Sequence, residues 1–130
     1  MPSILLIEDD DLFRETVALA LAESGYTIMQ ARDGDEGTRL LRVEPADLVI
    51  TDIVMPNKEG LATVMELRRD HPTLGIIAMS GGLAHDAPLY LKLAGNFGAN
   101  RTLRKPFELT ELLTAIKEVL AETARDQPAS

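Results

Sequence analysis

Short apolar runs alternate with longer amphipathic segments along the chain. The apolar runs favour β-strands at residues 4–7, 26–31, 48–51, 76–79 and, more weakly, 101–103. Apolar residues recur at helical spacing over residues 11–23, 35–43 and 60–70, in a segment opened by Asp86 and Pro88, and from about Glu108 onward. Five strands and five helices in strict alternation predict an α/β fold, with one mainly parallel sheet covered by helices on both faces.

Polar side chains stand where four of the predicted strands end. Glu8 and Asp9 follow the first strand, Asp52 the third, Ser80 the fourth and Lys105 the fifth. In open sheets of this kind, ligands bind beyond the carboxyl ends of the strands. Three carboxylates at one edge repel one another, so we expect a hard divalent cation, for which Mg²⁺ is suited. An ammonium and a hydroxyl beside that cation suggest phosphoryl transfer onto an aspartate.

Each of these residues also has a structural explanation. Acids that follow strands often cap helices, and a lone serine or lysine at a strand end is more commonly a surface residue than part of a site. The ordered combination favours the functional interpretation. For His71 and His85 we favour a structural interpretation, because neither lies in a helical setting suited to phosphotransfer.

Composition narrows the classes of function. The 130 residues include 13 Lys and Arg against 21 Asp and Glu, a net charge of −8 without a long basic run. This argues against non-specific binding to nucleic acid or an anionic membrane. The absence of cysteine excludes disulfides and thiolate chemistry. Without a secretory signal or an apolar stretch of about 20 residues, we expect one soluble, cytoplasmic domain.

Four motifs occur in order along the chain: LLIEDDD, DLVITDIVMPNKEG, AMSGG and LRKPF. With them, the sequence from Ile4 to about Ala124 resembles the receiver domain of two-component response regulators. The resemblance implies a flavodoxin-like (βα)5 fold, with a doubly wound five-stranded parallel sheet of order 2-1-3-4-5. We expect residues 1–125 to form the receiver domain and residues 126–130 a C-terminal tail.

The resemblance also implies roles for the acidic residues. Asp52 matches the phospho-acceptor, which would attack the phosphohistidine of a partner kinase. Asp9 matches a direct Mg²⁺ ligand, Glu8 a residue that holds a metal-bound water, and Val54 the position whose backbone carbonyl binds the metal. The next two acids, residues 10 and 11, would instead begin the first helix, where negative charge meets the positive end of the helix dipole.

The remaining roles concern the phosphoryl group and the conformational switch. Ser80 matches the hydroxyl that reaches a phosphoryl oxygen and draws the following loop inward. Lys105 matches the lysine that pairs with the phosphoryl group, and the family usually has a cis peptide bond before the next proline, here Pro106.

Two positions depart from the family pattern. Thr102 occupies the place of the aromatic residue that normally responds when the Ser/Thr moves, so the readout would run through the loop or through Tyr90 and Phe97. The loop after Ser80 opens with Gly81-Gly82, which makes it a candidate mobile element. Gly82 also matches a position that helps set the lifetime of the phosphate in this family.

We therefore expect a single-domain response regulator that promotes its own phosphorylation and dephosphorylation but is not a separate turnover enzyme. Its expected partners are a histidine kinase or phosphotransfer protein and a downstream protein target, with no nucleic acid or membrane, and its expected state is a monomer or weak homodimer. Two alternatives stay open: a phosphorylation-independent pseudo-receiver, and a Mg²⁺-dependent phosphatase with an aspartyl-phosphate intermediate. The phosphatase usually needs a second acid two residues after the nucleophile, and that residue is Val54.

Overall fold

The computed structural model describes residues 1–53, 60–81 and 87–126. Strands and helices alternate along these residues. The elements are β1 (Ser3–Ile7), α1 (Asp11–Glu23), β2 (Thr27–Ala31), α2 (Gly34–Val43), β3 (Leu48–Asp52), α3 (Gly60–Asp70), β4 (Gly75–Gly81), α4 (Ala87–Asn96), β5 (Arg101–Lys105) and α5 (Leu109–Asp126). The predicted alternation is confirmed, although Asp86 and all but the first residue of the predicted tail lie outside the described residues.

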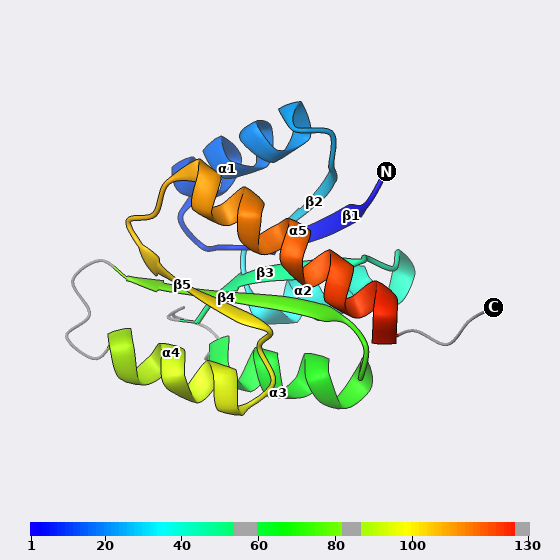
Figure 1. Cartoon of the computed structure of the whole chain (residues 1–130), viewed down its shortest axis with the longest axis vertical. Coiled ribbons are helices and arrows are strands. Elements are labelled where there is room, and N and C mark those ends of the chain that lie inside the picture. Colours follow the sequence, from blue (N-terminus) through cyan, green and yellow to red (C-terminus); the bar gives the residue numbers. More distant parts are fainter. Residues whose placement is uncertain (54–59, 82–86, 127–130) are drawn as a thin grey trace.

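Within the described residues, the five strands form one sheet in the order β2-β1-β3-β4-β5, and every neighbouring pair is parallel (Figure 1). The first connection moves the chain from β1 to one edge, and the later connections move it through β3 and β4 to the other edge. This reversal of direction between β1 and β3 confirms the predicted doubly wound, flavodoxin-like order.

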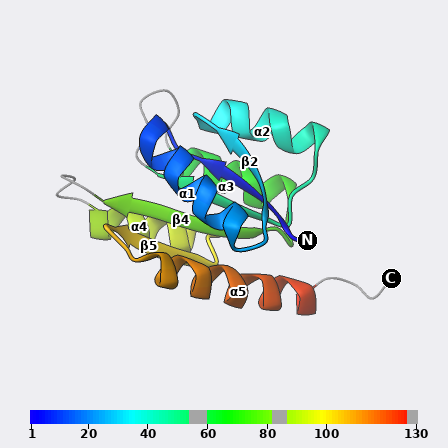
Figure 2. The same ribbon diagram turned by 90° about the horizontal axis from the view of Figure 1, so that it is seen from above.

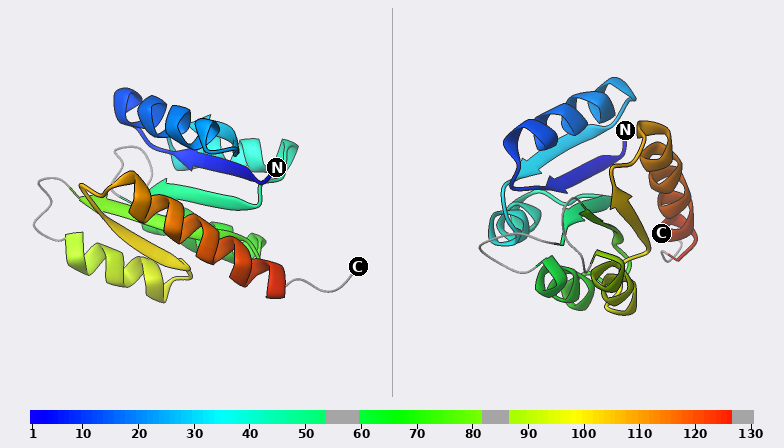
Figure 3. Two further views of the ribbon diagram at one scale, coloured as in Figure 1. Left: turned by 45° about the horizontal axis from the view of Figure 1, so that its top comes forward. Right: turned by 90° about the vertical axis from the view of Figure 1, so that its left-hand side faces the viewer.

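Helices cover both faces of the sheet, as Figures 2 and 3 show from further directions. Side chains of β1 alternate between two apolar clusters. Leu5 and Ile7 pack in the cluster beneath α2, α3 and α4, whereas Ile4 and Leu6 pack in the cluster beneath α1 and α5. All four are fully buried, which explains why this strand is a continuous apolar run.

The strands extend further than their apolar runs predict. Asp52 pairs with Met79, Ser80 with Arg104 and Gly81 with Lys105 in the parallel register. The sequence analysis was therefore wrong to put Asp52, Ser80 and Lys105 after their strands. They occupy the strand ends because backbone pairing continues after the apolar residues stop, and the sheet itself fixes their backbones.

The edge strand β5 alternates half-buried and exposed residues, which explains its weak apolar pattern. Among the described helices, none combines the length and apolar character needed to cross a membrane.

Near the amino ends of the strands, on the far side of the sheet from Asp52 and Lys105, Arg68 joins α3 to the segment after α4. Its guanidinium donates to the backbone carbonyl of Gly98 at 2.8 and 3.1 Å and to Pro72 O at 2.8 Å. It also donates to Asn100 Oδ1 at 2.8 Å, and the same oxygen accepts from Ile76 N at 2.9 Å. Burial lowers the pKa of Arg68 from its usual value. The ends of both helices are thereby fixed to the start of β4.

Replacing Arg68 with methionine is expected to lower the free energy of unfolding by about 2–3 kcal/mol, because several carbonyl oxygens lose a charged donor. Urea unfolding measures this loss. The matched control is Arg69→Met, which removes an exposed arginine paired with Asp70 at 3.0 Å and should lower the free energy of unfolding much less, because water screens this pair. Equal losses in the two variants would contradict a special role for Arg68.

Candidate functional site

Polar side chains lie at the carboxyl ends of four strands. Glu8 and Asp9 directly follow β1, Asp52 is the last residue of β3, and Lys105 is the last residue of β5. Ser80 is the penultimate residue of β4. Because β1, β3, β4 and β5 are successive neighbours in a parallel sheet, residues far apart in the sequence meet at this edge (Figure 1).

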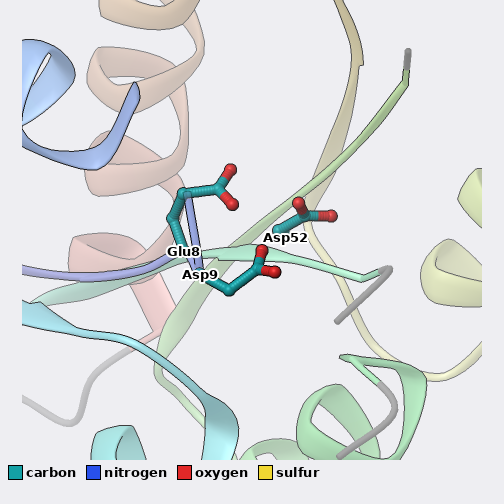
Figure 4. A group of neighbouring side chains, drawn as sticks. All are labelled: Glu8, Asp9 and Asp52. Carbon is teal, nitrogen blue, oxygen red and sulfur yellow. The ribbon is translucent and has the colours of Figure 1, made fainter. Parts of the chain in front are cut away.

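The three acids form a compact cluster. Glu8, Asp9 and Asp52 each offer a carboxylate oxygen, and these oxygens lie within 4.8 Å of one another. Figure 4 shows the three side chains gathered where β1 and β3 end. Glu8 is 1% exposed and Asp52 7% exposed, whereas Asp9 is on the surface. Two acids are therefore held largely out of water, where their mutual repulsion is weakly screened.

One ammonium group enters this cluster. Lys105 Nζ contacts Glu8 Oε1 and lies 3.1 Å from Asp52 Oδ2, and the lysine side chain is 19% exposed. Burial opposes the charge on Lys105, but the hydrogen bond that its ammonium donates to Glu8 and the charges of Asp52 and Glu8 outweigh burial and raise the lysine pKa. With all groups ionised, three negative charges face one positive charge, which leaves an excess that a divalent cation would balance.

Asp9 experiences this excess directly. Although Asp9 is largely exposed, partial loss of water around its carboxylate raises its pKa, and the interaction with Glu8 raises the pKa further. The charge of Lys105 lowers the pKa but does not reverse the shift. Ionised Asp9 is thus disfavoured by its surroundings, and an added cation would relieve that cost.

Ser80 contributes a buried hydroxyl to the same edge. Its residue is fully buried, and its Oγ has no hydrogen-bond partner within the described part of the chain. A buried polar atom without a partner is uncommon in proteins and points to a group that binds there.

The other two acids of the EDDD run lie at the beginning of α1, as predicted. Asp10 is the N-cap, and its side chain accepts a hydrogen bond from Phe13 N at 3.0 Å. Asp11 lies in the first helical turn and pairs with Arg14 at 2.8 Å. Neither belongs to the carboxylate cluster found among the described residues.

Sequence reasoning missed Arg14. Its buried guanidinium donates to the backbone carbonyl of Glu8 at 2.9 Å and to the side chain of Gln30 at 3.1 Å. Arg14 thereby holds the chain at the end of β1 against β2. The available signal was an arginine on the helical stripe that also carries Val17 and Leu21.

Gly60 fixes the backbone next to Asp52. A Cβ atom at this position would lie 2.1 Å from Ile53 Cα and 2.5 Å from Asp52 O. The amide of Gly60 donates to Ile53 O at 3.2 Å. Only glycine allows α3 to begin this close to the end of β3.

Other predicted positions are placed as follows. The Lys105–Pro106 peptide bond is cis. Thr102 is exposed and lines a cavity of about 400 Å³ between β5 and α5. Phe97 is 36% exposed just after α4. Residues Val54, Gly82 and His85, and the side chain of Tyr90, lie outside what the structure describes.

Curated proteins with similar sequences are signalling proteins. The chain is 33% identical over 126 residues to the DNA-binding dual master transcriptional regulator RpaA of Synechocystis, a match that covers 96% of this chain and 52% of RpaA. It is 35% identical over 120 residues to the sensor kinase CckA of Brucella abortus, covering 91% of this chain and 12% of CckA. The chain thus spans about half the length of the regulator and a small part of the kinase.

Solved structures with the same fold are receiver domains and response regulators. A CheY-like receiver domain protein from Methanospirillum hungatei has a TM-score of 0.88 and 25% identity, with 98% of this chain and 99% of that chain covered. The response regulator TrrA of Thermotoga maritima, solved in complex with Mg²⁺-BeF, has a TM-score of 0.80 and 30% identity, with 92% and 99% covered.

A family model described as the response regulator receiver domain matches residues 4–117. This match covers most of the chain and includes β1 from Ile4 onward, the whole of β2, β3, β4 and β5, and the cluster at the carboxyl ends of the strands. The chain therefore belongs to the receiver domain family of two-component response regulators.

Proposed function

We propose that this receiver domain accepts a phosphoryl group on Asp52, with Mg²⁺ as the cofactor and a phosphohistidine as the donor. The observation that carries the proposal is the meeting of Glu8, Asp9, Asp52 and Lys105 at one edge of the sheet. The buried hydroxyl of Ser80, which has no partner among the described residues, supports it.

The donor set fits Mg²⁺. This ion prefers oxygen ligands at about 2.0–2.1 Å, so two ligands of one octahedron lie at most about 4.2 Å apart. The carboxylate oxygens of Glu8, Asp9 and Asp52 lie within 4.8 Å of one another, so a small approach of two of these acids would bring their oxygens within that limit. Asp9 and Asp52 would bind the ion directly and Glu8 through a water molecule, while the proposed backbone ligand Val54 lies outside the described residues.

In the transfer step, an oxygen of the Asp52 carboxylate attacks the phosphorus of the donor's phosphohistidine. A P–O bond forms as the P–N bond breaks. The electron pair of the broken bond stays on the imidazole nitrogen, which takes up a proton from water. When bound, Mg²⁺ supplies positive charge that offsets the negative charge of the phosphoryl oxygens and the carboxylates.

Lys105 and Ser80 then act on the phosphoryl group. Lys105 Nζ is 3.1 Å from Asp52 Oδ2, so it is close enough to pair with an oxygen on the acquired group. The Ser80 hydroxyl would donate to another phosphoryl oxygen and gain the partner that it lacks among the described residues. Because Ser80 is the penultimate residue of β4, this contact would pull on the segment that follows the strand.

The signal would pass to a partner protein through the β4-α4-β5 surface. Thr102 is exposed on β5, beside the cavity formed with α5. A threonine offers no large ring that could move between buried and exposed positions. The response would therefore be carried by the segment after β4 rather than by an aromatic side chain at position 102.

Incubation with acetyl phosphate and Mg²⁺ is expected to add one phosphoryl group to the wild-type protein, detected by intact mass spectrometry. Asp52→Ala should add none, because the attacking carboxylate is missing. Asp11→Asn is the matched control, since it removes a nearby acid that lies outside the cluster, and it should still be phosphorylated. An unmodified wild type, or equal modification of Asp52→Ala, would falsify the proposal.

Removing one acid should stabilise the metal-free protein. In EDTA, we expect Asp52→Asn to raise the free energy of unfolding by about 1 kcal/mol, or about 4 °C in melting temperature. The variant loses repulsion, whereas Lys105 keeps Glu8 as a partner. Added Mg²⁺ should narrow the difference, because it stabilises the wild type more strongly.

Asp11→Asn should shift the melting temperature in the opposite direction, because Asp11 pairs with Arg14 and lies at the positive end of α1. A lower melting temperature for Asp52→Asn in EDTA would mean that the protein itself compensates the charges of the cluster.

A further inference from the structure

An aromatic ring lies against the ammonium group of the site. Lys105 Nζ is 4.3 Å from the centroid of the Phe13 ring, in a cation–π contact. The same ammonium contacts Glu8 and Asp52. Lys105 is therefore held by two carboxylates and one ring, which come from the residue after β1, from β3 and from α1.

The position of this ring is fixed from two sides. The amide of Phe13 donates to the side chain of Asp10, the N-cap of α1, so the ring projects from the first turn of the helix. The ring of Phe107 meets it edge to face, with centroids 6.1 Å apart and planes at 81°. Both rings pack against the apolar cluster between the sheet and the helices α1 and α5. The N-cap hydrogen bond and the contact with Phe107 thus hold the Phe13 ring in place beside Lys105.

An aromatic face holds a cation differently from a carboxylate. The ring quadrupole attracts the ammonium without accepting a directed hydrogen bond, so the three N–H donors remain available to oxygen atoms. The ring also covers one side of the ammonium with apolar surface, which strengthens its interaction with neighbouring negative charges. A lysine on such a surface can exchange one oxygen partner for another while it keeps the contact with the ring.

We propose that Phe13 is a positioning residue for Lys105, which keeps the ammonium beside Asp52 as its partner changes from Glu8 to a phosphoryl oxygen. This inference rests on the proposed phosphorylation of Asp52. It concerns the rate of that reaction and not the binding of the metal, because Phe13 contributes no oxygen ligand.

The test compares variants of the full chain. Phe13→Leu keeps an apolar side chain and removes the ring face, whereas Phe13→Tyr keeps the face. Tyr26→Leu is the matched control, because it removes a ring that packs against the same apolar cluster but lies beyond the far end of α1. The first measurement is the NMR shift of the Lys105 ε-methylene protons in metal-free protein. A ring current should move them upfield in the wild type, Phe13→Tyr and Tyr26→Leu, and not in Phe13→Leu.

The second measurement is the rate of phosphorylation by acetyl phosphate at saturating Mg²⁺. Phe13→Leu is expected to slow it about fivefold, as for the loss of a cation–π contact, while Phe13→Tyr and Tyr26→Leu should stay within about twofold of the wild type. Mg²⁺ affinity should be the same in all four proteins.

Two results would overturn the inference: Lys105 protons without an upfield shift in the wild type, or a Phe13→Tyr rate as low as that of Phe13→Leu. A wild type that takes no phosphoryl group would instead reject the proposed function. The NMR comparison would then still decide whether the ring lies over Lys105.

Discussion

The repulsion among three carboxylates at one edge of the sheet is the constraint on which the site depends. Two unit charges about 4 Å apart repel by roughly 4 kcal/mol at an effective dielectric of about 20. Glu8 and Asp52 are nearly buried, so water does little to reduce this cost. Lys105 offsets part of it by contacting both acids. The remaining negative charge would favour the binding of a cation, and the same electrostatics would favour a phosphoryl group once that cation is bound.

The apolar packing on both faces of the sheet offsets the repulsion within this cluster. Alternate residues of β1 enter two apolar clusters, and the polar residues begin where that strand ends. Backbone pairing holds Asp52, Ser80 and Lys105 in register, so these polar side chains are attached to backbone that the sheet holds in place. Near the amino ends of the strands, hydrogen bonds of Arg68 and Asn100 connect the ends of α3 and α4 to the start of β4. Hydrogen bonds from Arg68 thus join the elements near the amino ends of the strands, and the polar site lies at their carboxyl ends.

Much of this arrangement could be predicted from the sequence, because short continuous apolar runs indicate the strands and the hydrophobic period of 3.6 residues indicates the helices between them. Parallel pairing then requires the residues at the strand ends to meet, which is why the acids, Ser80 and Lys105 could be grouped. The extent of the strands could not be predicted, since Lys105 and Asp52 pair in the sheet without being apolar. The pattern of apolar residues indicates which side chains are buried, but it does not show where backbone pairing continues through polar residues.

Contacts that depend on the packing of distant segments were also missed. Arg14 binds Gln30, 16 residues away, and Arg68 binds Gly98, 30 residues away. Both arginines lie on the apolar stripe of a helix, a pattern that indicates burial but does not name the partner. The contact of Phe13 with Lys105 is of the same kind, because an apolar residue in a first helical turn is ordinarily expected to pack in the core.

The most direct test of the account is a crystal structure of this chain with Mg²⁺ and beryllofluoride, which imitates a phosphoryl group on a carboxylate. If Asp52 accepts the phosphoryl group, we expect beryllofluoride on Asp52 and the metal bound by Asp9 and Asp52. We also expect fluorine atoms in contact with Ser80 Oγ and Lys105 Nζ. Beryllofluoride attached elsewhere, or a metal that leaves Asp9 and Asp52 uncoordinated, would contradict the central claim that these strand ends form one phosphoryl-accepting site.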